Sequence, residues 1–260
     1  MSCGEKTQHE LEIFVLDVGQ GDAILLRTRE GDVLIDAGPE SAQEALCYRL
    51  EELGVERLKL AVFTHSDEDH VGGADGVLRS FPTESVWIGS YFEQNESSQM
   101  LFEAAYETDA NVVRVNDGTH LELGTVSIFV LFPFALVEEA SSNDQSIVLS
   151  VTCGSVRALF MGDVSEKNER ALLERYPTPQ LNCALLKVAH HGSETSSCAE
   201  FVEATSPQYA VIGCGRGNAY GHPHGIVLER LEAVGARILR TDLHGDIAFY
   251  TDGVALTRKE

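Results

Sequence analysis

The densest group of chemically active side chains lies between Thr64 and Gly73, where the sequence is THSDEDHVGG. An apolar stretch from Leu60 to Phe63 precedes this segment and predicts a strand that ends at it. The segment contains four ligand-type residues, His65, Asp67, Asp69 and His70. Such closely spaced groups cannot all point one way from a regular strand or helix, but on a loop they can surround metal ions. A solvated acidic turn is the simpler alternative. The flanking histidines and the following Gly72-Gly73 pair favour a metal site.

Two later segments offer further candidate ligands. Asp163 follows the apolar stretch Leu159–Gly162, at the end of a predicted strand. An aspartate after a glycine is more often a turn residue or a helix cap, but the first loop makes metal binding the better interpretation. The pair His190-His191 follows a strand-like stretch. Either histidine could face a metal, and we favour His190 as the ligand and His191 as a supporting or substrate-contacting residue.

These residues need a scaffold of strands and helices, and apolar periodicity predicts both. Helices are predicted after Ser41, whose pairing with Glu44 resembles a capping box, and at Glu166–Tyr176, Ser197–Thr205 and Ile226–Val234. Two β-rich halves, each followed by helices, predict two packed sheets with helices outside. The predicted strands are Leu11–Asp17, Ala23–Thr28, Asp32–Asp36, Leu60–Thr64, Ser85–Ile88, Val112–Val115, Thr125–Phe132, Ser146–Thr152, Val156–Met161, Cys183–Ala189, Tyr209–Gly213, Arg237–Arg240 and Asp246–Tyr250.

The composition is that of a globular α/β protein. Of 260 residues 43% are hydrophobic, and we expect one domain over 1–260 with a polar, flexible segment at 1–10. No apolar run reaches the roughly 18 residues needed to span a bilayer. Six scattered cysteines without a CxxC pair favour a reducing compartment, and hence the cytoplasm. Cys3 leaves a secreted or lipid-anchored form open if a signal segment preceded it.

The net charge of −22 limits the partners of the chain. Lysine and arginine contacts to phosphates supply most non-specific affinity for nucleic acid, so an acidic surface disfavours stable binding of long DNA. A local basic strip or bound divalent ions would relax this restriction. The sequence does not predict an oligomeric state.

Several motifs together resemble the metallo-β-lactamase superfamily, whose HxHxDH pattern becomes HxDxDH here through Asp67. This variant resembles the hydrolase domain of ComEC, the competence DNA-uptake protein, and its stand-alone relatives. The resemblance covers nearly the whole chain. The other matching segments are Phe14–Asp22 (FVLDVGQGD), Leu34–Gly38 (LIDAG), Ser142–Ser146 (SNDQS), Met161–Asp163 (MGD), Leu186–Ser193 (LKVAHHGS) and Tyr220–His224 (YGHPH).

The resemblance implies a four-layer αββα sandwich of two mixed β-sheets flanked by helices, and a dinuclear metal site. His65 and Asp67 would hold one metal ion, Asp69 and His70 would hold the other, Asp163 would bridge them, and His190 would complete the second. Asp69, His191, His222 and His224 would serve catalysis or line the substrate cleft. Asn143 lies where other members carry a histidine, which leaves that position open or filled by water.

The resemblance also implies hydrolysis by a hydroxide that bridges two divalent ions, zinc or manganese. Asp67, Asp69, Asp163 and this hydroxide carry four negative charges, which balance two divalent cations, and the oxygen-rich set makes Mn²⁺ a credible partner. We expect a phosphodiesterase or nuclease-like enzyme acting on a small phosphodiester, a nucleotide or a short nucleic acid. The alternatives are a lactonase, thioesterase or β-lactamase-type carboxyl hydrolase, and a non-catalytic metal-binding module.

Overall fold

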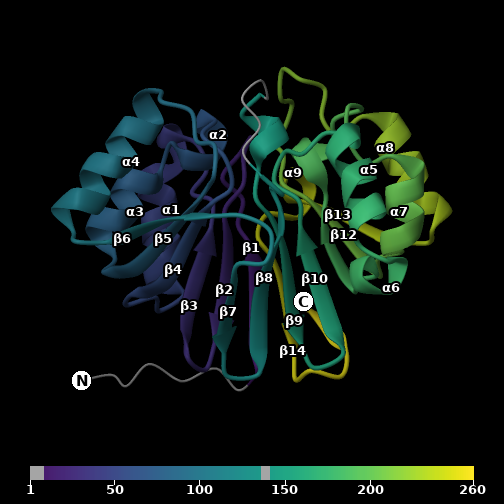
Figure 1. Cartoon of the computed structure of the whole chain (residues 1–260), viewed down its shortest axis with the longest axis horizontal. Helices are drawn as coiled ribbons and strands as arrows, with labels where there is room; N and C mark the ends of the chain where they lie inside the picture. Colours follow the sequence, from purple (N-terminus) through teal and green to yellow (C-terminus); the bar gives the residue numbers. More distant parts are fainter. Residues whose placement is uncertain (1–8, 136–140) are drawn as a thin grey trace.

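Two β-sheets pack face to face, and helices cover the outer face of each (Figure 1). The computed structural model describes residues 9–135 and 141–260. The predicted flexible segment at 1–10 and Cys3 therefore lie largely outside the described residues. None of the helices in the described part of the chain is long and apolar enough to cross a membrane.

The first sheet has eight strands in the order β15-β14-β1-β2-β3-β4-β5-β6. Strands β14, β1, β2 and β3 pair antiparallel, and β3 to β6 pair parallel, so the sheet is mixed. Its strands are β1 (Leu11–Val15), β2 (Ile24–Thr28), β3 (Gly31–Ile35), β4 (Leu58–Phe63), β5 (Thr83–Gly89), β6 (Asn111–Val115), β14 (Ile247–Thr251) and β15 (Leu256–Lys259).

The second sheet has seven strands in the order β13-β12-β11-β10-β9-β8-β7 and is also mixed. Its parallel part runs from β10 to β13, and its antiparallel part from β7 to β10. Its strands are β7 (His120–Leu123), β8 (Val126–Phe132), β9 (Val148–Cys153), β10 (Val156–Phe160), β11 (Leu185–Lys187), β12 (Tyr209–Ile212) and β13 (Arg237–Arg240).

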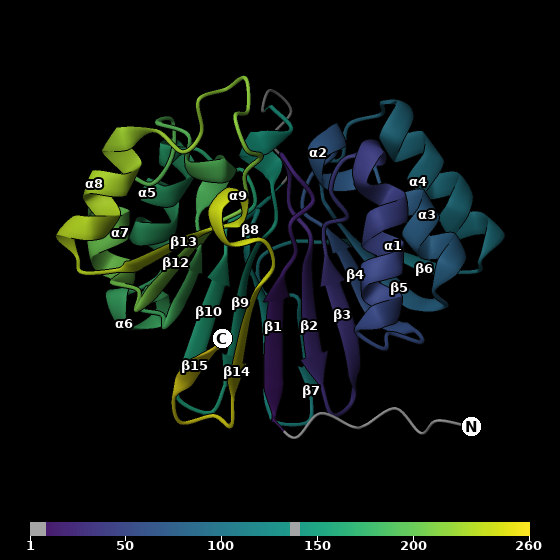
Figure 2. The same cartoon turned by 180° about the vertical axis from the view of Figure 1, so that it is seen from behind.

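The helices form the two outer layers. Helices α1, α3 and α4 cover the first sheet, and α5, α7 and α8 cover the second, as both views show (Figures 1 and 2). The helices are α1 (Gln43–Glu52), α2 (Glu68–Val71), α3 (Ala74–Ser80), α4 (Glu96–Glu107), α5 (Glu166–Arg175), α6 (Thr178–Leu181), α7 (Ala199–Thr205), α8 (Gly225–Ala233) and α9 (Thr241–His244), with 3₁₀ turns at Glu40–Ala42, Asn143–Gln145 and Ala189–Gly192.

Alternation along the strands sends side chains into different apolar layers. Ile13 and Val15 of β1 pack between the two sheets, whereas Phe14 packs beneath the helices of the first sheet. A third cluster lies between the second sheet and its helices. Each fully buried aliphatic or aromatic side chain contributes roughly 1.5–3 kcal/mol. These three apolar layers confirm the expected four-layer αββα architecture.

Most predicted elements are present, with one correction and several omissions. The capping box at Ser41 is wrong, because α1 begins at Gln43, its N-cap is Ala42 and no side chain caps it. A 3₁₀ turn at Glu40–Ala42 leads into the helix instead. Helices α4, α6 and α9 and strand β15 are absent from the prediction.

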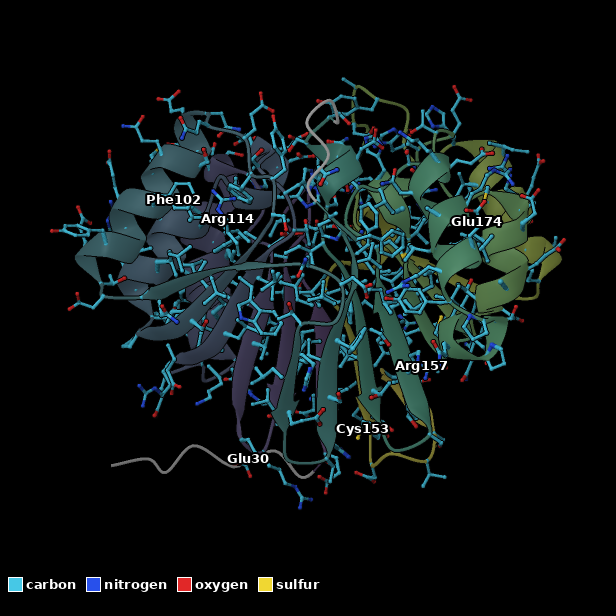
Figure 3. The ribbon with its side chains drawn as sticks, in the orientation of Figure 1. Glu30, Phe102, Arg114, Cys153, Arg157 and Glu174 are labelled. Carbon is cyan, nitrogen blue, oxygen red and sulfur yellow. The ribbon has the colours of Figure 1, made fainter. Side chains whose placement is uncertain are left out.

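The candidate residues gather at one end of the sandwich. Helix α2, which carries His70, lies at the upper end in Figure 1. Glu30 and Cys153, labelled in Figure 3, lie toward the opposite end, where the strands are joined by tight turns.

Candidate metal centre

The loop from Thr64 to Asp67 follows β4, as predicted, and α2 begins immediately after it at Glu68. The imidazoles of His65 and His70 are buried, whereas the carboxylates of Asp67 and Asp69 are partly exposed. Gly21 lets a second loop approach this one, since a Cβ there would collide with the carbonyl oxygen of Asp69. Asp22, the next residue, is thereby brought to the same place, and its N–H donates to that oxygen over 3.2 Å.

Four buried groups form a tight cluster, in which one ligand atom from each of Asp22, His70, Asp163 and His191 lies within 4.8 Å of the others. His70 Nε2 lies 3.3 Å from Asp163 Oδ1 and 3.2 Å from His191 Nε2. His191 Nε2 lies 3.5 Å from Asp163 Oδ2 and 3.2 Å from Asp69 Oδ2. A tetrahedral ion with ligands at roughly 2.0–2.1 Å separates its ligand atoms by about 3.3 Å, so the spacing fits a metal ion.

Several buried atoms in this region have no hydrogen-bond partner among the described residues. They include His65 Nε2, Asp163 Oδ1, Asp22 Oδ1 and His222 Nδ1. An unpaired polar atom in a protein interior costs free energy, so such atoms are rare unless an ion or a water satisfies them. Their presence on candidate ligands supports a cation between them.

Hydrogen bonds from the surrounding backbone and side chains orient the imidazoles. Asp36, which is buried, lies 2.8 Å from His70 Nδ1 and accepts from the Thr64 N–H and hydroxyl. His191 Nδ1 lies 2.8 Å from the carbonyl oxygen of Gly213. A carbonyl only accepts, so this Nδ1 carries a proton, and in the neutral ring the Nε2 lone pair would face Asp163.

The charges of the cluster shift its pKa values. Burial lowers the pKa of His70, but Asp163 and Asp36 outweigh it and raise the pKa well above 6.5. Burial raises the pKa of Asp163, but His70 and His191 hold it well below 3.8. The metal-free cluster therefore retains protons among its histidines, and an entering cation must displace them.

His65 is in a different electrostatic position. Burial, together with the neighbouring His70, lowers the pKa of His65 to about 4. Its imidazole is therefore neutral near pH 7, the state in which histidine binds metal. Asp67 Oδ2 lies 3.7 Å from His65 Nε2, so these two residues lie close together beside the cluster.

The structure separates the two adjacent histidines. His191 lies in the buried cluster, while His190 Nε2 is 3.8 Å from Asp163 Oδ2 and its side chain is 28% exposed. Asn143 Nδ2 lies 3.4 Å from His190 Nε2. Both histidines have left-handed φ values of 49° and 52°, which turn the chain so that strand alternation no longer decides which ring points inward.

His222 and His224 lie beside the cluster, on the loop before α8. The ring centroid of His222 lies 5.7 Å from that of His190 and 5.1 Å from that of His224. Burial and the surrounding histidines lower the pKa of His222 to about 4. His224 Nδ1 accepts a hydrogen bond from the backbone of Glu194.

Sequence reasoning missed Asp22 and Lys187. Lys187 is fully buried, and its Nζ lies 2.6 Å from Asp22 Oδ2. Both residues belong to segments singled out above, yet nothing in their spacing revealed the pair. A charged lysine at the end of an otherwise apolar strand was the available signal, because buried lysines are nearly always paired.

A cavity of about 570 Å³ opens onto the partly exposed carboxylates of the site. Asp67 and Asp69 line one part of it, and Gln20, Asn95 and Tyr220 line another. The candidate centre is therefore accessible to a small substrate through an acidic cleft.

Two mixed sheets packed face to face, with a histidine–aspartate loop and a buried aspartate at one end, define the metallo-β-lactamase fold class. The family model described as "Metallo-beta-lactamase superfamily" matches residues 16–216, and the chain belongs to this superfamily. The chain therefore has the hydrolase fold of this superfamily and carries a candidate metal-binding cluster.

The curated relatives include competence proteins. The chain is 30% identical over 258 residues to ComE operon protein 3 of Bacillus subtilis, covering 92% of this chain and 33% of that protein. It is 34% identical over 246 residues to competence protein ComA of Neisseria gonorrhoeae, covering 93% of this chain and 32% of that protein. The ComEC-like resemblance is thus confirmed, and the chain spans about a third of the length of these relatives.

Solved structures show the same fold at low identity. The metallo-β-lactamase fold protein YhfI from Bacillus subtilis superposes with a TM-score of 0.57 at 12% identity, covering 88% of this chain and 96% of that one. A putative metal-dependent hydrolase from Parabacteroides distasonis gives 0.54 at 12% identity, covering 89% and 94%. These similarities concern the fold alone.

Proposed function

We propose that this chain is a metal-dependent phosphodiesterase with two divalent ions, manganese or zinc, at the cluster. The observation that carries the proposal is the oxygen-rich ligand set around Asp163 Oδ1 and His65 Nε2, two buried atoms that form no hydrogen bond within the described part of the chain. The carboxylates of Asp67, Asp69 and Asp163 suit harder ions and offset the charge of a cation pair. Phosphoryl transfer is a reaction in which paired cations are commonly used.

In this proposal, His65 and Asp67 form one half-site, and Asp69, His70 and His191 form the other. Asp163 would bridge the two: its oxygens lie 3.3 Å from His70 Nε2 and 3.5 Å from His191 Nε2, and the nearby His65 contributes to lowering its pKa. We place His191 in the second half-site in preference to His190, since His191 has the short contacts and the oriented lone pair. His190 then lies beside Asn143, with 3.4 Å between His190 Nε2 and Asn143 Nδ2.

Divalent ions at such a site supply Lewis acidity, which activates water and neutralises charge on phosphate oxygens. The residues of the chain hold the geometry. Asp36 fixes the ring of His70, and the Gly213 carbonyl fixes the tautomer of His191. His222, neutral near pH 7, and His224 lie where they can donate to a phosphate oxygen, a role in which preorganised donors count most.

The curated relatives favour a substrate related to nucleic acid, since two of them are named competence proteins. The net charge of −22 favours small diesters or short oligonucleotides over long DNA. A carboxyl hydrolase remains the competing function, because the same activated water would attack a carbonyl.

A substrate panel tests the proposal. The protein, loaded with Mn²⁺ or Zn²⁺, is assayed with bis(p-nitrophenyl) phosphate, nitrocefin and a thioester. We expect diester hydrolysis to be the fastest and Mn²⁺ to support at least the rate of Zn²⁺. Asp163→Asn, nearly identical in shape, should abolish turnover while the circular dichroism spectrum is unchanged. Strong nitrocefin or thioester turnover without diester cleavage under both metals would refute the phosphodiesterase.

A further inference from the structure

The cleft contains an exposed aromatic side chain that the proposed chemistry does not use. Tyr220 is 66% exposed, and it lines the same cavity as Asp67 and Asp69. Among residues 9–135 and 141–260, its hydroxyl has no hydrogen-bond partner. A large ring in this position adds little to folding and is free to contact a ligand in the cleft.

The backbone around Tyr220 is held firmly although its side chain is exposed. Asn218 accepts from the N–H of His222 at 3.0 Å and donates to the carbonyl oxygen of His222 at 2.7 Å. Its Nδ2 also donates to the carbonyl oxygen of Gly215. The loop around Tyr220 is therefore closed by one side chain, and a ligand would not have to order it.

Three nearly parallel rings, those of Tyr220, His222 and His191, follow one another from the surface to the buried cluster, and Tyr220 is the outermost. Its centroid lies 5.5 Å from that of His222, with 22° between the planes. His222 in turn lies 6.3 Å from His191, with 27° between the planes. His222 supports the tyrosine ring from within, and the exposed part of the ring is available to a planar ligand.

The acidity of the chain limits how such a ligand can be bound. At a net charge of −22, with Asp67 and Asp69 in the cleft, little affinity for an anion can come from the protein's own cations. Stacking of a base on an aromatic ring is independent of charge and is tolerant of sequence.

We infer that Tyr220, supported by His222, forms a stacking subsite for a nucleobase attached to the phosphate that is cleaved. This inference rests on the proposed phosphodiesterase and specifies its substrate as a nucleoside diester. The base would lie on Tyr220 while the phosphate lies at the divalent ions that Asp67 and Asp69 would help to hold.

A comparison of matched substrates tests the subsite by turnover. The manganese-loaded protein is assayed with a thymidine dinucleotide and with analogues in which either nucleoside is replaced by an abasic deoxyribose. We expect Tyr220→Ala to raise KM for the dinucleotide about tenfold, with kcat nearly unchanged, because stacking contributes equally before and during the reaction. Tyr220→Phe should retain the wild-type KM. Tyr106→Ala, at an exposed tyrosine on α4, is the matched control and should leave KM unchanged.

Binding without turnover separates the subsite from the activity. Calorimetry in Ca²⁺ compares thymidine monophosphate with deoxyribose 5-phosphate. We expect Tyr220→Ala to weaken only the nucleotide, about tenfold. Equal effects on ligands with and without a base, or no effect of Tyr220→Ala on either KM or Kd, would overturn the subsite even if diesters are cleaved. Base-dependent binding at Tyr220 without cleavage of any diester would support the subsite and refute the phosphodiesterase.

Discussion

The ring of His191 is fixed on both sides, by the Gly213 carbonyl at Nδ1 and by Asp69 and Asp163 around Nε2. His191→Ala removes a proposed ligand and should weaken metal binding at least about 100-fold. Loss of a residue that only hydrogen-bonds to a ligand already weakens metal binding by up to about 100-fold. His190→Ala should change it much less. Calorimetric titration with Mn²⁺ and Zn²⁺ measures both affinities. If His190→Ala weakens metal binding more than His191→Ala does, His190 is the ligand.

The buried pair of Lys187 and Asp22 makes a second prediction at this scale. Lys187→Met leaves the carboxylate of Asp22 buried without its cation, and we expect a loss of about 3–5 kcal/mol in the free energy of unfolding. Urea denaturation of the metal-free protein measures it.

The matched control for this pair is the double variant Lys187→Met with Asp22→Asn, which removes the stranded charge. It should recover a substantial part of the loss. Equal stability of the single and double variants would show that Lys187 does not compensate Asp22.

At the residue scale, His65, Asp69, His70 and Asp163 lie close together in the structure, and their role as ligands stays a prediction. The choice between His190 and His191 could not be predicted, because it depends on two consecutive left-handed residues. Asp22 could not be placed either, since its approach depends on a long-range contact permitted by Gly21.

Helices α5 and α7 are joined by a single buried carboxylate. Glu169 of α5 accepts from the backbone N–H groups of Ser197, at 2.7 Å, and Cys198, at 2.8 Å, where α7 begins. Glu169→Gln replaces one acceptor oxygen with a donor. We expect it to cost about 1–3 kcal/mol near pH 5, the range for leaving a buried group unsatisfied.

This carboxylate should also make the stability depend on pH. Burial raises the pKa of Glu169 to about 7 from 4.5, although the two N–H groups oppose the shift. A folded-state pKa above the unfolded value favours the folded protein at low pH, and this contribution is lost as the pH rises through about 7.

The advantage of wild type over Glu169→Gln should therefore shrink from pH 5 to pH 8. Urea titrations of both proteins at the two pH values measure it, and the site histidines, common to both, cancel in the difference. A constant or growing advantage would show that Glu169 is ionised throughout.

Elements were predictable from periodicity where many apolar residues alternate, as in β1 and β8. Helix α4 was not predicted because three of its four buried residues are serine or alanine, which give a weak apolar pattern, although reciprocal hydrogen bonds between Asn95 and Ser98 fix its start. Strand β15 was not predicted because only Leu256 of its four residues is buried. Its signal is pairing with β14, which a local pattern does not contain.

At the scale of the molecule, the proposed ligands come from both sheets. The loop from His65 to His70 follows the first sheet, whereas Asp163 and His191 follow strands of the second. Metal ions at this position would link the two sheets, and they would bind the folded protein but not the unfolded chain. Ions at about 100 times Kd should add about 2.7 kcal/mol to the free energy of unfolding.

Thermal denaturation with and without a chelator measures this effect. We expect the chelator to lower Tm by roughly 5–11 °C for a chain of this size. Metal analysis of the loaded protein should give two ions per chain. Asp163→Asn should lose most of the shift, and an unchanged Tm in the wild type would argue against ions between the sheets.

Strand β14 lies between β15 and β1, although more than 200 residues separate β14 from β1 along the chain. A ribosome that adds about 5–20 residues per second needs roughly 10–50 s to make that stretch. During this time the backbone of β1 has an open edge, which is a template for pairing with other chains. Newly made protein should therefore depend on chaperones until Ile247–Thr251 emerges, and premature termination before it should yield aggregates instead of a smaller folded product.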